Sequence, residues 1–146
     1  ATVAVLNDGA VEPEKQVLGG SLTLDTVSNT QAIIGLPMTS TLTTLNIENP
    51  MKDGSSQGRE KRVQEIVISV HKTAAFRFGR LPNRMDEAYT RDTANSMDAA
   101  PPLFTGRYIR KFPCSNETDS KVTVQQTAPL PLTLIAVIPK YNVTGD

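Results

Sequence analysis

The sequence predicts an all-β fold, either an antiparallel β-sandwich or a barrel-like domain. Ten prolines and nine glycines punctuate short runs rich in β-branched residues, and this spacing is typical of antiparallel sheets. Two tight-turn dipeptides and several stretches of alternating apolar and polar residues point the same way. The length is that of one ordinary domain. We therefore expect residues 1–146 to form a single β-rich domain, and we expect this domain to be a fragment of a longer protein.

The N-terminal run TVAVL ends in Asn7-Asp8-Gly9. Asp-Gly favours a tight turn because both positions tolerate a positive φ, so a first hairpin is expected here. A second turn is expected at Gly19-Gly20, between QVL and SLTL.

The stretch GLPMTSTL, residues 35–42, alternates apolar and polar side chains. Leu36, Met38 and Leu42 share one parity, while threonines occupy the other, which predicts a strand buried on one face. Pro37 restricts its own position to a strand start, an edge or a bulge. The parity reverses after Thr43, so a bulge or bend is expected near Thr44.

Residues 59–79, REKRVQEIVISVHKTAAFRFG, fit helical spacing at some positions. However, one strand parity collects almost all the large apolar side chains, interrupted only by Lys72: Ile66, Ile68, Val70, Ala74, Phe76 and Phe78. The β-branched residues also oppose a helix. This segment is therefore interpreted as a long strand or a bent hairpin.

The residues from about 80 to 103 have neither a helical nor a strand period, which predicts one long irregular loop, with a short helix over residues 85–89 as an alternative. Strands are expected again at FTGRYIRKF, at SKVTVQQT and at LPLTLIAVIP. The last run is apolar on both parities, which predicts a central strand covered on both sides and ended by Pro139.

Composition excludes several classes of protein. Formal net charge is zero, which argues against specific nucleic-acid recognition and against binding to anionic membranes. No apolar run is long enough to insert into a membrane. The single cysteine, Cys114, excludes an internal disulfide and a multi-cysteine zinc site, and no cofactor motif is present.

The sequence offers few candidates for catalytic residues. His71, the only histidine, lies on the polar parity of its strand without a nucleophile motif. Asp86, Glu87, Asp92 and Asp98 could supply the paired carboxylates of a hydrolase, although solvated loop charges are the simpler interpretation. We therefore expect no catalytic residues, no metal ligands and no cofactor.

Five sequence blocks together resemble the C-terminal region of tail proteins from short-tailed bacteriophages, a family of tail tubular or nozzle proteins. The blocks lie in VLNDGAVEPEKQVLGGSLTLDT, AIIGLPMTSTLTTLNIE, SSQGREKRVQEIVISVHKT, PPLFTGRYIRKFP and VTVQQTAPLPLTLIAVIPKY. The residues that carry the last four are Gly35, Leu36, Pro37, Thr39 and Ser40; Gln57, Gly58, Lys61 and Arg62; Leu103, Phe104, Thr105 and Gly106; and Pro129, Leu130, Pro131 and Thr133. Met38, Lys140 and the segment 80–100 depart from the family pattern.

The resemblance implies a non-enzymatic structural component of the virion, which forms a homo-oligomeric ring of six copies and a DNA conduit. It also implies contacts with other tail proteins such as an adaptor or fibres. Charged side chains and the loop are expected to make the contact between copies: Arg59, Lys61, Arg62, Arg80, Arg84, Asp86 and Tyr89. The alternative is a receptor- or glycan-binding module on the tail, with Tyr89 or Tyr108 as the aromatic platform.

Overall fold

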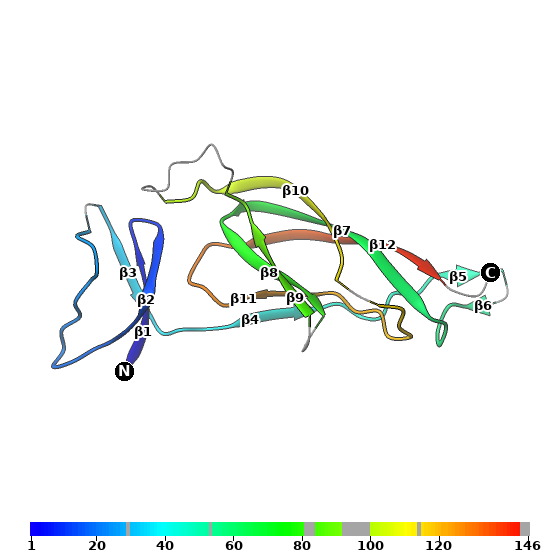
Figure 1. Ribbon diagram of the computed structural model, residues 1–146, viewed down its shortest axis with the longest axis horizontal. Coiled ribbons are helices and arrows are strands. Elements are labelled where there is room, and N and C mark those ends of the chain that lie inside the picture. Colours follow the sequence, from blue (N-terminus) through cyan, green and yellow to red (C-terminus); the bar gives the residue numbers. More distant parts are fainter. Residues whose placement is uncertain (29, 53, 81–83, 92–99, 114, 144–146) are drawn as a thin grey trace.

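The computed structural model describes residues 1–28, 30–52, 54–80, 84–91, 100–113 and 115–143. These residues form strands, turns and irregular segments, and no helix occurs among them. The strands assemble into several antiparallel sheets that pack together (Figure 1). The predicted all-β, sandwich-like fold is therefore confirmed.

Two of the sheets form the layers of the sandwich. The first has the order β10-β7-β12, with β7 at Lys61–Thr73, β10 at Phe104–Lys111 and β12 at Thr133–Val143. The second has the order β4-β11-β8-β9, with β4 at Ser40–Thr43, β8 at Ala75–Arg80, β9 at Arg84–Tyr89 and β11 at Thr123–Gln126. Between them lies the buried core of Val63, Ile66, Ile68, Val70, Phe76, Phe78, Ala88, Phe112, Val122 and Val124.

Strands β7 and β8 are one bent segment that passes from one layer to the other. Every apolar residue on the predicted parity is buried on both sides of the bend, which confirms the strand interpretation. Lys72, the polar interruption, has a φ of 44° and lies at the bend. The two halves pair with different neighbours, so the segment is a bent strand and not a hairpin.

Three hydrogen bonds hold the bend from outside the segment. The Lys72 N–H donates to Thr105 Oγ1 at 2.9 Å, and the Ala74 N–H donates to the Pro131 carbonyl at 3.2 Å. Thr73 is fully buried, and its Oγ1 accepts from the Thr133 N–H at 3.2 Å. Thr105, Pro131 and Thr133 belong to the fourth and fifth blocks of the resemblance, so those blocks meet at this bend.

A smaller sheet of order β2-β1-β3 lies beside one end of the sandwich (Figure 1). It consists of β1 at Thr2–Asn7, β2 at Ala10–Gln16 and β3 at Ala32–Gly35. The predicted hairpin joins β1 to β2, with φ values of 47° at Asp8 and 83° at Gly9. The second predicted turn is also present, because Leu18 and Ser21 exchange two backbone hydrogen bonds across Gly19-Gly20. A two-residue pair, β5 at Pro50–Met51 and β6 at Gly54–Ser55, completes the strands.

The long-loop prediction for residues 80–103 is wrong over residues 84–89. These residues form strand β9, which pairs with β8 from Ala75↔Tyr89 to Arg80↔Arg84, so the helical alternative is also wrong. On this edge strand the inward parity holds Arg84, Asp86 and Ala88, and only Ala88 is buried. The sequence of β9 therefore lacks the alternation of apolar and polar residues that would indicate a strand. Residues 81–83 and 92–99 lie outside the described residues.

The C-terminal run is an edge strand, not the predicted central one. Strand β12 flanks β7, and Ile135 and Ile138 on it are exposed. Pro139 lies inside β12, where its missing N–H is tolerated because an edge strand has one unpaired side. The central strand of this layer is β7.

The predicted strand over residues 35–42 is divided between two sheets. Gly35 ends β3, Ser40 begins β4, and residues 36–39 between them belong to neither strand. Leu36 and Met38 are 76% and 77% exposed, so the alternation does not mark a face that is buried within this chain. Pro37 interrupts the run because it cannot donate to a ladder. The change expected near Thr44 coincides with the end of β4.

Candidate interaction surface

Residues 26–47 contain no Asp, Glu, Lys, Arg or His, and we call them the uncharged segment. Its large apolar side chains are unusually open to solvent. Those exposed are Val27, Ile33, Ile34, Leu36, Met38, Leu42 and Leu45. Scattered exposed apolar residues are ordinary, but a gathering of them that is also depleted in charge is typical of protein interfaces. The segment is therefore the strongest candidate for a functional surface.

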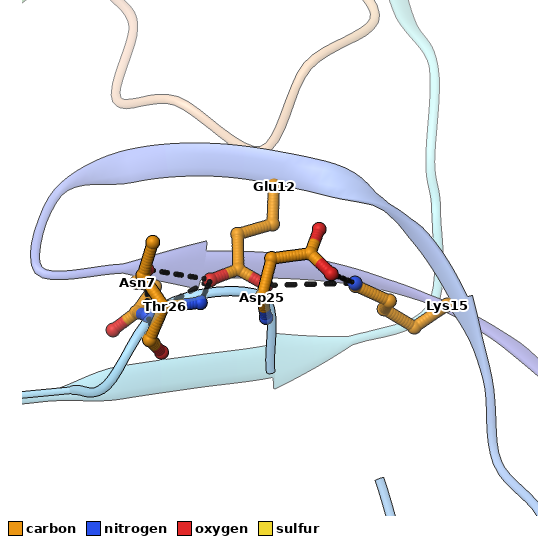
Figure 2. A network of polar contacts seen from close by, with 5 residues as sticks. All are labelled: Asn7, Glu12, Lys15, Asp25 and Thr26. Carbon is orange, nitrogen blue, oxygen red and sulfur yellow. Dashed lines mark hydrogen bonds and ion pairs between the residues drawn. The ribbon is translucent and has the colours of Figure 1, made fainter. Parts of the chain in front are cut away.

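A buried carboxylate fixes the start of the uncharged segment (Figure 2). Glu12 on β2 is buried, and its Oε1 accepts a hydrogen bond from Asn7 Nδ2 at 2.9 Å. Its two oxygens also accept from the Asp25 N–H at 3.0 Å and from Thr26 Oγ1 at 3.0 Å. Together these bonds, with that from Asn7 the largest contributor, lower the pKa of Glu12 to about 2. Lys15 pairs with Asp25 beside them.

A second carboxylate fixes the approach to β3. Asp8 Oδ1, in the hairpin turn, accepts hydrogen bonds from the N–H groups of Thr30 at 3.0 Å and Gln31 at 2.8 Å. The Asp8 N–H in turn donates to the Gln31 carbonyl at 2.8 Å. The charged groups of the hairpin thus hold the segment in place from its flank, while the segment itself carries no charge.

The far end of the uncharged segment is held by β11 and the residues before it. The Thr44 N–H donates to the Val122 carbonyl at 2.9 Å, and the Val122 N–H donates to Thr44 Oγ1 at 3.0 Å. The Ile47 N–H donates to the Ser120 carbonyl at 3.1 Å. Because both ends are hydrogen-bonded, the exposed apolar side chains belong to a positioned surface.

The charged residues predicted for a contact between copies lie at two places. Lys61 and Arg62 begin β7, and Arg59 lies two residues before it. The other four lie on β8 and β9: Arg80, Arg84, Asp86 and Tyr89. Glu117 joins the two places. It exchanges backbone hydrogen bonds of 2.7 and 2.9 Å with Lys61, and its carboxylate pairs with Arg80.

Lys61 departs from the expectation for this group. It is only 1% exposed, so its side chain belongs to the interior of the chain and is not presented to a neighbour. Arg62 is exposed on β7, and Arg84, Asp86 and Tyr89 are exposed on β9. The residue types alone predict that all the basic side chains of this run lie on the surface. In a strand, however, successive side chains point to opposite faces, so Lys61 points inward and Arg62 outward.

Tyr89 and Tyr108, the two tyrosines considered for sugar binding, line one hollow between β9 and β10. The hollow has a volume of about 570 Å³, and Phe78, Asp86, Glu87, Arg110 and Lys111 complete its lining. Tyr108 is engaged on several sides, because the guanidinium of Arg110 lies 4.8 Å from its ring centre and Phe76 and Phe78 meet its ring edge to face. Tyr89 is exposed, and its hydroxyl bonds to Glu87.

The structure brings no catalytic arrangement together among the described residues. His71 is exposed on β7, and Asp86 and Glu87 follow one another on β9, where successive side chains point to opposite faces. Cys114, Asp92 and Asp98 lie outside the described residues. Within the described ranges, no three His, Cys, Asp or Glu side chains could hold a metal ion. No helix in this part of the chain is long and apolar enough to cross a membrane.

The sequence did not identify the uncharged segment as an exposed surface, because its alternation of apolar and polar residues predicts a strand buried on one face. A usable signal was present in the absence of charge from Thr26 to Ile47, in a chain that is 21% charged as a whole. The backbone pairing of β3 and β4 supplies the rest of the geometry. Comparison of the sequence with protein-family models and with curated proteins gives no match.

Proposed function

We propose that this chain is a non-enzymatic structural component of a bacteriophage tail, located in the virion. In this proposal copies of the protein associate into a ring of six, which contributes to the wall of the DNA conduit and contacts neighbouring tail proteins such as an adaptor or fibres. The order of the five sequence blocks supports the family, and the all-β scaffold is compatible with it.

The observation that carries the proposal is the positioned, uncharged segment with its exposed apolar side chains. Leu36, Met38 and Leu45 are each at least 76% exposed. Burying such side chains against a partner is favourable by about 25 cal/mol per Å² of apolar surface. A surface of this kind suits assembly better than it suits the binding of a polar small molecule.

Electron microscopy of a longer chain that contains this region tests the proposal. We expect rings with a central lumen, and a six-fold class average would support the stoichiometry. Particles that stay monomeric at all concentrations, or filaments without a lumen, would contradict the proposed role in a conduit.

A second candidate is a receptor- or glycan-binding module, and the hollow between β9 and β10 favours it. An exposed aromatic ring beside carboxylate and guanidinium groups is a reasonable setting for a sugar. Against it, Tyr108 is partly buried, so of the two tyrosines that line the hollow Tyr89 alone is exposed. A glycan array with wild type, Tyr89→Ala and, as a control, Tyr141→Ala would decide. Saturable binding that only Tyr89→Ala abolishes would favour this function over the first.

A further inference from the structure

The described sheets end in free edges, and these edges differ in how they are protected against pairing with another strand. Charged side chains and proline discourage strand addition at an exposed edge. The protected edges carry such residues: Pro13 and Glu14 on β2, Arg84, Asp86 and Glu87 on β9, Arg107, Arg110 and Lys111 on β10, and Pro139 and Lys140 on β12. Strands β5 and β6 have only two residues each.

Strands β3 and β4 are the exceptions among the described edges. Their sequences, AIIG and STLT, contain neither a charge nor a proline, and every residue in both is exposed. Each is the terminal strand of its sheet. Both lie in the uncharged segment. The two edges that lack protection thus combine exposed apolar or β-branched side chains with the absence of charge.

The pairing pattern shows which backbone groups point outward on these edges. In an antiparallel pair, directly opposed residues alternate between hydrogen-bonded and non-hydrogen-bonded positions. The Thr44 N–H donates to the carbonyl of Val122, its direct partner, so Thr44 is at a hydrogen-bonded position. By the alternation, the backbone of Leu42 also bonds to β11, while Thr41 and Thr43 direct their N–H and C=O groups to the free side.

The same count applies to β3. The Asp8 N–H donates to the carbonyl of Gln31, its direct partner, so Gln31 is at a hydrogen-bonded position. Two residues on, the backbone of Ile33 therefore also bonds to β1, while Ala32 and Ile34 direct their backbone groups outward. Two residues on each edge therefore offer backbone donors and acceptors to an added strand.

We propose that the free edge of β3 in one copy of the chain pairs with the free edge of β4 in the next copy. This inference rests on the proposed structural function and names the contact that performs it. Two uncharged edges can pair without bringing a charged side chain or a proline into the contact, whereas each protected edge would bring at least one of these. Ile34 would lie beside threonines of β4, and such β-branched neighbours favour cross-strand contact. The contact joins two different patches, so it repeats from copy to copy and can close into a ring.

Edge-blocking charges test the pairing in the 146-residue chain. Ile34→Lys blocks β3, Thr41→Lys blocks β4, and Asn142→Lys adds the same charge to the protected edge β12 as a control. Sedimentation velocity should find oligomers for wild type and for the control, and monomers for each edge variant alone. An equimolar mixture of the two edge variants should give a one-to-one dimer, because each partner keeps one usable edge.

The other outcomes separate this inference from the proposed function. If wild type is oligomeric and both edge variants remain so, the edge pairing is overturned while assembly stands. If Ile34→Lys assembles and Thr41→Lys does not, β4 pairs with itself and the head-to-tail contact is overturned. If wild type is monomeric at every concentration, a second copy is not the occupant, and microscopy of the longer chain decides the function separately.

Amide hydrogen exchange supplies a readout that does not depend on size. In the wild-type oligomer the amides of Ala32, Ile34, Thr41 and Thr43 should exchange at least tenfold more slowly than in the edge-variant monomers. The amides of Ile33 and Leu42, bonded within the chain, should be protected in both and so report that the variants fold. Equal exchange of the outward amides in oligomer and monomer would overturn the inference.

Discussion

Glu12 and Asn7 form a buried hydrogen bond of 2.9 Å between the two strands of the N-terminal hairpin. The bond is part of the network that ties Asp25 and Thr26 to the hairpin and so fixes where the uncharged segment begins (Figure 2). The network therefore connects the ionisation of one side chain to the position of the candidate interaction surface.

Acid should weaken this part of the fold. The folded-state pKa of Glu12, about 2, lies below its ordinary value of 4.5, so the carboxylate stabilises the fold fully above pH 4.5. That contribution is lost as the pH falls from 4.5 through 2. Urea unfolding across this range should show the loss in wild type and a smaller one in Glu12→Gln. Glu14 is exposed on the same strand, so Glu14→Gln should keep the wild-type profile. Identical profiles for all three proteins would contradict the assignment.

Gly79 should not tolerate a side chain. Its φ is +151°, and a Cβ at this position would lie 2.1 Å from the carbonyl oxygen of Arg84 on the paired strand. Gly79→Ala should lower the free energy of unfolding by roughly 1–3 kcal/mol, because the backbone of β9 must move. Gly35→Ala, where nothing lies within 4 Å of the added Cβ, serves as the control and should be close to neutral in chemical denaturation.

Two isoleucines on neighbouring strands of one layer should respond differently to truncation. Ile68 on β7 is fully buried, so Ile68→Ala should cost about 2–5 kcal/mol through lost burial and a cavity. Ile138 on β12 is 48% exposed, and Ile138→Ala should cost well under half as much. Thermal unfolding of both variants checks the order. Equal losses would mean that β12 is covered as a central strand would be.

Lys61 and Arg62 should separate folding from assembly. Lys61→Glu should destabilise the chain by about 3 kcal/mol or more, because it reverses the charge of a fully buried side chain. Arg62→Glu should change stability by no more than about 0.5 kcal/mol, as expected for a surface position. If the charged contact between copies exists, Arg62→Glu weakens association without loss of fold. Equal stabilities for the two variants would contradict the inward placement of Lys61.

Alternation in the sequence was enough to find the strands that form the core. Ile66 to Val70 and Phe76 to Phe78 keep one parity across the bend, and all the apolar residues on it are buried. The turn at Asp8-Gly9 was equally accessible, because both residue types tolerate the positive φ that the turn requires. In these places local preference and tertiary packing agree.

Edge strands could not be predicted in the same way. On β9 the inward positions include Arg84 and Asp86, so the pattern does not distinguish this strand from a loop. On β12 both parities are apolar, although Ile135 is exposed. Leu36 and Met38 alternate as a buried face would, yet both side chains are exposed. Periodicity reports which side of a strand is apolar, but it does not report what lies against that side.

The bend at Lys72 has a mechanical consequence. Because one continuous stretch of backbone supplies the middle strand of one layer and an inner strand of the other, a pull on either layer reaches the other through covalent bonds. The hydrogen bonds from Thr105, Pro131 and Thr133 fix the backbone conformation at the bend, so the junction between the layers is itself held in place. Force applied to one layer would therefore reach the other along the backbone itself, without depending on the apolar contacts between them.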